Sequence, residues 1–305
     1  MGGRKLNSVL HKNSNSLKLG ESWEISGYNE NISVVKEGAL KGKSLNQLID
    51  EYKEELLGDS VFKKFGHTFP LLVKFIDANQ DLSVQLHPND ELAYKRHKSF
   101  GKTEMWYIIH ADTDAELIIG FNQEVDQALY ENKIAKGKLP KLLRHIPVQK
   151  GDSFFINAGT IHAIGAGILL AEIQQTSDIT YRVYDWERKD VNGNSRELHT
   201  DLAFDAINYK SKDDKKLIYD SSQVMSELMR CDYFTTNLLK VKESIVRDLT
   251  KIDSFKIYIC VKGSGTISIN SDYKCVNLGD VFLIPAINKE VILMGNNMEL
   301  LEVYI

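Results

Sequence analysis

Cysteine is the first residue that this chain has little of. Its 305 residues include three cysteines, Cys231, Cys260 and Cys275, which are odd in number and lack CxxC spacing. This pattern argues against a disulfide framework and against a thiolate metal site, and it favours the reducing conditions of the cytoplasm. We interpret the three residues as core thiols.

Long apolar runs and an excess of basic charge are also missing. No stretch approaches the roughly 20 apolar residues that a membrane-spanning helix needs, and the N-terminal segment is polar, without the apolar centre of a secretion signal. The net charge of −4 and the pI near 6.1 exclude a global attraction to nucleic acid or to an acidic membrane. We predict a cytoplasmic protein with a small-molecule partner, and a local basic pocket for one phosphate is compatible with this charge.

Proline is scarce, with five residues in all, and the chain consists largely of short strand-like runs. These runs are rich in β-branched and aromatic residues and are separated by Asn, Asp and Gly, which predicts a mainly β protein. In the N-terminal part they cover residues 71–78, 82–88, 104–111, 115–121, 152–158 and 169–176. In the C-terminal part they cover residues 233–241, 255–263, 265–270, 281–286 and 298–305.

Helical periodicity is confined to a few segments. Residues 45–58 carry apolar residues on one stripe and end at a glycine, which predicts a helix. A second apolar pattern, at about 123–145, predicts a helical insertion between strands. Residues 210–228 are charged and then helix-like, and we interpret them as a connector between two β-rich halves. The chain is thus predicted to form domains at 1–230 and 231–305, built as two stacked barrels or sandwiches.

The two halves share one phrase. A Gly-Asp pair, followed by an apolar strand and a tight bend, occurs at residues 151–162 and again at residues 279–289. The first copy ends on His162, whereas the second has Lys289 near that place. An internal duplication with one functional copy is the simplest interpretation.

The run at residues 82–88 carries two candidate metal ligands. On a strand, residues two apart point to the same face, so Gln85 and His87 should share one. Pro88 ends the strand, which leaves His87 near its rim. Taken alone, the pair is more typical of a polar face on an exposed strand than of a metal site.

Two further candidates come from other strands. Glu104 opens an apolar strand and shares a face with Lys102, and His162 follows a glycine-threonine turn. A Lys beside a Glu is most often a solvated ion pair, and a single His is more often structural than a ligand. As a set, however, two imidazoles, a carboxylate and the Gln85 amide come from three strand ends. Such donors suit Zn²⁺, Fe²⁺, Mn²⁺ or Co²⁺, and three or four protein ligands with an open position indicate a catalytic site.

Glu172 and Arg182 lie in the next part of the chain. Glu172 and Gln174 share one face of a strand, and Arg182 falls in an apolar and aromatic context where an unpaired guanidinium would be costly. Arg182 therefore needs either an acidic partner, Asp185 or Glu187, or an anionic substrate. Arginine suits phosphate because its N–H donors match two oxygens at once.

At these residues the chain resembles a type I mannose-6-phosphate isomerase of the short bacterial kind, in the cupin superfamily. The matching phrases run in the family's order and spacing at residues 69–74, 83–88, 101–109, 159–163 and 174–185. The chain departs from the family at its start, where members usually have a further strand that leads into a Trp-Gly-Gly phrase. The resemblance implies two cupin-type (jelly-roll) β-barrels, with the helical insertion in the first and no metal ligands in the second.

Members of this family interconvert mannose 6-phosphate and fructose 6-phosphate with a bound zinc. The resemblance implies one zinc per chain, held by His87, Glu104, His162 and, as a fourth ligand, Gln85. It matches Arg182 to the family's active-site arginine, and it matches Lys102 and Glu172 to positions that line the sugar pocket.

The implied reaction moves a proton between C1 and C2 of the sugar through an enediol, which requires a base and stabilisation of negative charge. Arg182 is the candidate that binds the anion. The base is Lys102 or Glu172, and burial and a nearby zinc would lower the pKa of a lysine base. Two alternatives are an iron-dependent cupin oxygenase, which the Arg182 phrase disfavours, and a non-enzymatic sugar-binding cupin, which the complete ligand set disfavours.

Overall fold

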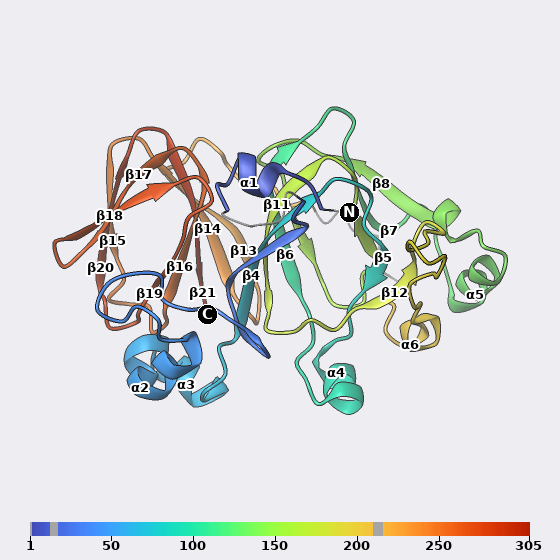
Figure 1. Ribbon diagram of the computed structural model, residues 1–305, viewed down its shortest axis with the longest axis horizontal. Coiled ribbons are helices and arrows are strands. Elements are labelled where there is room, and N and C mark those ends of the chain that lie inside the picture. Colours follow the sequence, from blue (N-terminus) through green and yellow to red (C-terminus); the bar gives the residue numbers. More distant parts are fainter. Residues whose placement is uncertain (1, 13–17, 210–215) are drawn as a thin grey trace. The chain divides into compact units, whose positions relative to one another are not determined.

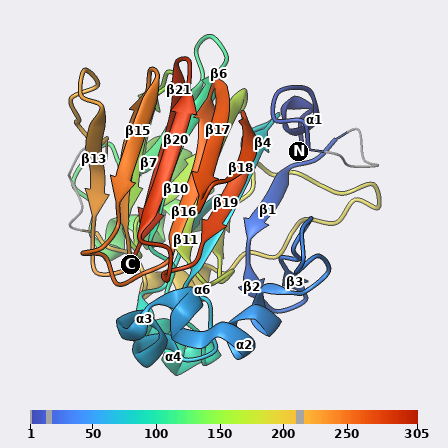
Figure 2. The ribbon, with the colours of Figure 1, turned by 90° about the vertical axis from the view of Figure 1, so that its left-hand side faces the viewer.

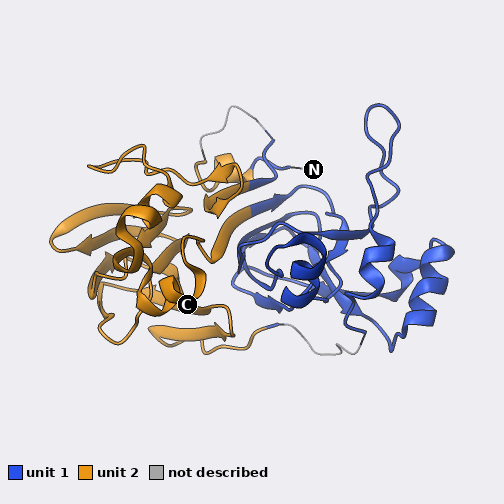
Figure 3. Ribbon diagram, turned by 90° about the horizontal axis from the view of Figure 1, so that it is seen from below, with its two compact units in different colours: residues 1–4, 16–21, 76–216 blue, residues 5–15, 22–75, 217–305 orange. Residues whose placement is uncertain are grey.

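The computed structural model describes residues 2–12, 18–209 and 216–305. The chain is mainly β, as predicted (Figure 1). Two compact units are distinguished by the contacts within each: residues 1–4, 16–21 and 76–216, and residues 5–15, 22–75 and 217–305 (Figure 3). In this grouping residues 22–75 fall with residues 217–305, and the predicted division at residue 230 stays a prediction. Among the described residues, no helix is both long and apolar enough to cross a membrane.

Two five-stranded sheets are built from the N-terminal strands. Across the first, the order is β1 (Glu21–Ile25), β4 (Leu71–Ala78), β11 (Ile168–Gln175), β6 (Glu104–Ala111) and β9 (Ser153–Ile156). Across the second, the order is β12 (Tyr181–Tyr184), β5 (Val84–Leu86), β10 (His162–Ile164), β7 (Glu116–Phe121) and β8 (Leu143–Pro147). One apolar cluster takes Trp106 and Leu170 from the first sheet and Leu117 and Ile164 from the second, so the sheets face each other across a shared core.

The C-terminal strands repeat this arrangement (Figure 2). One sheet has the order β13 (Met225–Arg230), β14 (Thr235–Val241), β21 (Met298–Tyr304), β16 (Lys256–Lys262) and β19 (Val281–Ile284). The other has the order β15 (Ser244–Asp248), β20 (Glu290–Gly295), β17 (Ser264–Ile269) and β18 (Asp272–Asn277). β2 (Gly27–Tyr28) and β3 (Asn31–Ile32) form a small separate sheet. Closure of either pair of sheets into a barrel stays a prediction.

α2 (Leu45–Leu57) confirms the predicted helix at residues 45–58. Ser44 begins it with a capping box, in which its hydroxyl accepts from Gln47 N and the Gln47 side chain accepts from Ser44 N. α2 and α3 (Asp59–Phe65) lie at one end of the C-terminal sheets in Figure 2, and Phe255 N donates to Leu57 O. The other helices are α1 (Lys5–Ser8), α4 (Asp90–His97), α5 (Gln127–Ala135), α6 (Thr200–Phe204) and the 3-10 helix η1 (Leu139–Leu142).

The predicted helical insertion at residues 123–145 is only partly helical. It contains α5 and η1 and then enters strand β8 at Leu143. Tyr130 and Leu142 from this segment pack with Val84 and Leu86 on one face of the second sheet. The apolar pattern therefore reflects a short helix and an irregular segment that together cover a sheet.

The predicted helix-like connector at residues 210–228 is also corrected. Residues 210–215 lie outside the described residues, and the rest contains no helix, since β13 begins at Met225. In β13, Ser226 and Leu228 are buried whereas Met225 and Glu227 are exposed, which is the alternation of a strand.

The shared Gly-Asp phrase forms the same turn twice. Gly151 and Gly279 have φ angles of 91° and 90°, in the region that favours glycine. Asp152 and Asp280 each accept a hydrogen bond from the backbone N–H three residues earlier. The N–H of each glycine also donates to the neighbouring strand of its own sheet. These matched hydrogen bonds support the predicted internal duplication.

The strand registers then align the second half on the first. The registers give six pairs of corresponding positions: Gln85 and Arg247, His87 and Leu249, Glu104 and Lys256, His162 and Val291, Glu172 and Glu302, and Gln174 and Tyr304. Val291, two residues after Lys289, occupies the position that corresponds to His162, because the bend in the second copy is one residue longer. At the positions of His87, Glu104 and His162 the second half has Leu249, Lys256 and Val291. These side chains do not provide the ligands of a metal site.

Glu302 is the charged centre of the second half. It is fully buried and accepts hydrogen bonds from Arg247 Nε and Nη2 at 2.9 Å, from Tyr258 Oη at 2.9 Å and from Asn237 Nδ2 at 3.0 Å. Burial opposes ionisation of this carboxyl, but the hydrogen bonds and the charge of Arg247, with the other two donors, lower the pKa of Glu302.

We predict that Glu302→Gln lowers the free energy of unfolding by about 2–4 kcal/mol at pH 7, because it leaves the partly buried Arg247 without its counter-charge. Since the pKa of Glu302 is lowered on folding, its contribution is complete above the pKa of an unfolded glutamate, about 4.3, and is lost as the pH falls through the folded value. Urea unfolding at several pH values measures both effects.

The control is Glu227→Gln, which breaks an exposed pair with Arg230 and should cost less than about 1 kcal/mol at every pH. Equal losses for the two variants at pH 7 would contradict the assignment of Glu302 as the charged centre.

Candidate metal centre

His87 directly follows β5, and alternate residues along this strand face opposite sides of the sheet. Val84 and Leu86 pack in the apolar cluster on one face, so Gln85 and His87 point to the other, as predicted. The buried His87 ring donates from Nδ1 to the carbonyl oxygen of Ile179 at 2.8 Å. This hydrogen bond places the ring proton on Nδ1 and leaves Nε2 as the nitrogen that can bind a metal.

His162 begins β10, after a turn at Gly159 whose φ of 81° favours glycine. Its Nδ1 donates to Thr160 O at 2.9 Å, and its ring packs edge-on against Trp106 at 5.3 Å between centroids. The buried Nε2 has no hydrogen-bond partner among the described residues. Burial lowers the pKa of His162 to about 4, so the ring is neutral at neutral pH and can act as a ligand.

Glu104 lies between the two rings, at the start of β6, and is fully buried. Its carboxylate oxygens are 3.6 Å from His87 Nε2 and 3.4 Å from His162 Nε2. One ligand atom from each residue lies within 4.8 Å of the other two, so the three predicted ligands come together. Two imidazoles and a carboxylate fit a divalent metal, and the buried Nε2 of His162 lacks a partner among the described residues.

Gln85 occupies the middle of a row across the second sheet. Its Cα pairs with that of His162 on β10 and with that of Arg182 on β12, so the three side chains share a face. The side chain is half-buried, and its Oε1 accepts from Ser83 Oγ at 3.3 Å. Its role as a fourth ligand stays a prediction.

Lys102 and Glu172 stand beside Glu104, and their charges alternate in sign. Lys102 Nζ is 3.2 Å from Glu104 Oε2 and 3.9 Å from Glu172 Oε1, and Glu172 Oε2 accepts from Trp106 Nε1 at 2.9 Å. Burial alone would lower the pKa of Lys102, but the charges of Glu104, Glu172 and Asp178 outweigh it and raise that pKa. Burial thus acts on this pKa in the expected direction, but in the protein alone the carboxylates outweigh it. The expected effect of a bound zinc stays a prediction.

Arg182 lies on β12 at the edge of the sheet and is half-buried. Its Nη1 donates to Glu197 O at 2.9 Å, and its Nε has no hydrogen-bond partner among the described residues. The expected partner Asp185 instead binds Arg188 and Arg196. Burial lowers the pKa of Arg182, and the charges of Arg196 and Arg188 lower it further. The charge of Asp185 opposes this shift. A guanidinium placed among other cations is suited to an anionic ligand.

Sequence reasoning assigned no role to Gln174, which the structure places in the same group. It is fully buried on β11 and pairs with Glu104 on β6. Strand alternation showed that Gln174 shares a face with Glu172, but only the register between strands shows which residue lies opposite.

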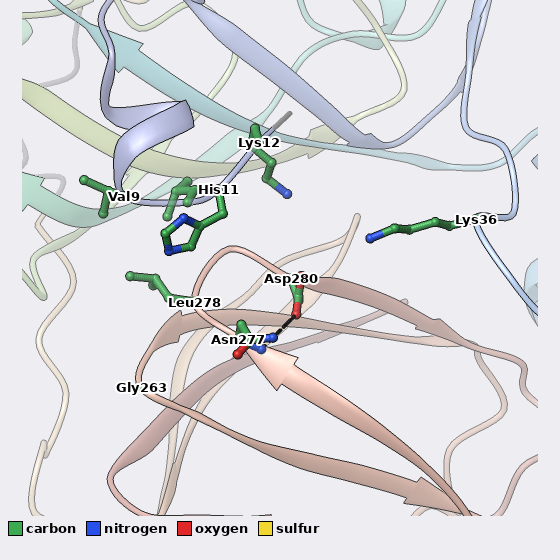
Figure 4. A pocket seen from close by; sticks show the side chains of 9 residues that line it. Val9, His11, Lys12, Lys36, Gly263, Asn277, Leu278 and Asp280 are labelled. Carbon is green, nitrogen blue, oxygen red and sulfur yellow. Dashed lines mark hydrogen bonds between the residues drawn. The ribbon is translucent and has the colours of Figure 1, made fainter. Parts of the chain in front are cut away.

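A cavity of about 700 Å³ lies elsewhere, within the second unit. Figure 4 shows Lys12, Lys36 and Asp280 around it. Lys12 Nζ is already paired with Glu24 at 2.6 Å, and Asp280 belongs to the Gly-Asp turn. Within the described part of the chain, the group of His87, Glu104 and His162 is the one that could hold a metal, so this cavity is not a second metal site.

Two family models match the chain. "Phosphomannose isomerase type I, catalytic domain" matches residues 4–107, and "Mannose-6-phosphate isomerase, cupin domain" matches residues 225–305. The first match contains His87, Glu104 and Lys102, and the second begins at the first strand of the C-terminal sheets.

Curated relatives and a solved structure extend this similarity over nearly the whole chain. A mannose-6-phosphate isomerase of Streptococcus mutans is 36% identical over 93% of this chain and 88% of its own. A probable mannose-6-phosphate isomerase of Bacillus subtilis is 38% identical over 93% of this chain and 89% of its own. The crystal structure of the mannose 6-phosphate isomerase from Bacillus subtilis covers all of this chain and 95% of its own, at a TM-score of 0.89 and 32% identity. The chain therefore belongs to the type I phosphomannose isomerase family.

Proposed function

We propose that this protein interconverts mannose 6-phosphate and fructose 6-phosphate at a single zinc ion. The observation that carries the proposal is the buried group of His87, Glu104 and His162, with Lys102 and Glu172 in contact beside it. Membership of the family supports the reaction and the phosphorylated sugar as substrate. The oxygenase and the binding-only cupin have no observation in their favour.

The metal would be held by His87 Nε2, His162 Nε2 and a Glu104 carboxylate oxygen, with Gln85 as the fourth ligand. These donors suit zinc, and a site with an open position is typical of a catalytic centre. When bound, the zinc supplies a Lewis acid that polarises the sugar oxygens.

We assign the base to Glu172, which takes the proton from one of the two reacting carbons and returns it to the other. Its Oε2 is oriented by Trp106 Nε1 and its Oε1 faces Lys102 Nζ at 3.9 Å. The carboxylates around Lys102 raise its pKa and favour its ammonium form, so we assign it a different role from the base. It can instead offer N–H donors to the negative charge that develops on the sugar oxygens. Arg182 supplies a guanidinium for the anionic oxygens of the substrate.

We predict that turnover of mannose 6-phosphate to fructose 6-phosphate requires zinc. A coupled assay on protein of known metal content should lose activity after chelation and regain it when zinc is restored. Protein that is fully loaded with zinc and still forms no product would contradict the proposed function.

We predict that His162→Ala reduces zinc affinity by more than roughly 100-fold, because even the loss of a residue that only orients a ligand costs about 10–100-fold. The control is His145→Ala, which removes an exposed histidine that lies 3.1 Å from Glu116. Metal content after dialysis against a zinc buffer measures the difference, and equal zinc retention by both variants would exclude His162 as a ligand.

We predict that Arg182→Ala keeps its zinc but loses about 10²–10³-fold in turnover, the loss expected when a donor to developing or bound negative charge is removed. Arg230→Ala, which removes an exposed arginine paired with Glu227, should behave as the wild type. Steady-state kinetics beside metal analysis distinguishes the two, and full turnover in Arg182→Ala would remove this residue from the mechanism.

A further inference from the structure

Gln174 has an amide whose two ends differ in their surroundings. Its side-chain nitrogen donates to Gln175 O at 2.8 Å and to Ser177 O at 2.5 Å, so both N–H groups are used. These two bonds distinguish the nitrogen from the oxygen and hold the amide in one orientation. Its Oε1 is buried and has no hydrogen-bond partner among the described residues.

A buried acceptor without a donor costs free energy, roughly 1–3 kcal/mol, so its missing partner needs an explanation. Gln174 is 0% exposed, so bulk solvent does not supply that partner. The missing group must carry an O–H or N–H that reaches the face on which Gln174 lies.

That face is the one that carries the candidate metal ligands. Gln174 pairs with Glu104 across β11 and β6, so the two side chains lie side by side. In the second half the corresponding residues, Lys256 and Tyr304, also lie side by side. The Lys256 ammonium is 4.7 Å from the centre of the Tyr304 ring. The Gln174 side chain therefore borders the metal group.

Donors of the protein at this place are already engaged. The Nδ1 protons of His87 and His162 bind backbone carbonyls, and the Trp106 indole binds Glu172. The Lys102 ammonium lies against Glu104 and Glu172. Gln174 Oε1 accepts from none of these groups, which leaves it open to a donor from the molecule that enters the site.

We propose that Gln174 is a substrate-binding residue whose Oε1 accepts a hydrogen bond from a hydroxyl group of the bound sugar phosphate. The inference rests on the proposed function, which supplies a polyhydroxylated substrate. A site built to accept this hydroxyl rejects an analogue that lacks it, because the acceptor is then left buried and unpaired. Gln174 thereby selects among phosphorylated sugars by the presence of one hydroxyl.

Gln174→Met tests this together with the substrate analogues described below, since methionine is similarly long and unbranched and lacks the acceptor as well as the two N–H donors. We expect kcat/KM for mannose 6-phosphate to fall roughly 10–100-fold, mostly through KM, with zinc content unchanged. The control is Tyr130→Phe, which removes another buried oxygen that has no partner among the described residues but lies in the cluster on the other face of the second sheet. Its kinetics should equal those of the wild type. Unchanged kcat/KM in folded, zinc-loaded Gln174→Met would overturn the proposal.

Deoxy analogues of mannose 6-phosphate give a second measurement, and its first part uses the wild-type protein alone. One analogue should bind the zinc-loaded wild type at least 10-fold more weakly than the parent sugar, and the Gln174→Met penalty should vanish for that analogue. Binding of every analogue within twofold of the parent would overturn the proposal. Affinity is measured by the shift in thermal midpoint, which does not depend on turnover. A protein that binds mannose 6-phosphate but forms no fructose 6-phosphate would therefore contradict the proposed function and leave the role of Gln174 in binding intact.

Discussion

The buried carboxylate of Glu104 is the constraint on which the arrangement of the first half depends. A charge that is removed from water is stable only if opposite charge or hydrogen-bond donors replace the solvent. Glu104 has Lys102 at 3.2 Å and two imidazole nitrogens at 3.4 and 3.6 Å. The two rings are oriented by backbone carbonyls, so their remaining nitrogens converge on the carboxylate. A divalent cation could complete this group.

The second half meets the same constraint with protein cations. Glu302 takes the place of Glu172 and is held by Arg247, which takes the place of Gln85, while Lys256 takes the place of Glu104. The duplicated strands and Gly-Asp turns are alike, so the backbone alone does not make a metal site. The side chains at a few inward positions decide whether the core has a candidate metal site, as in the first half, or an internal ion pair, as in the second.

Sequence patterns that involve only neighbouring residues predicted the structure well. The strands at residues 71–78 and 104–111 and the helix at 45–58 follow from alternation, periodicity and capping. The segment at 123–145 does contain helices between two strands, α5 and η1, and only its last residues belong to β8. The pKa of Lys102 is raised by Glu104, two residues away, and also by Glu172 and Asp178, which only the fold brings near it.

The sequence by itself determined the candidate ligands, since strand alternation and residue chemistry select Gln85, His87, Glu104 and His162, and the family resemblance supplies their order. The tertiary structure decided which side chains meet, because the register between β6 and β11 places Gln174 against Glu104, and the register between β15 and β20 places Val291, and not Lys289, where the first half has His162. The physical reason is that alternation along one strand is a local property, whereas the neighbour across a sheet is set by turns and core packing far away in the chain.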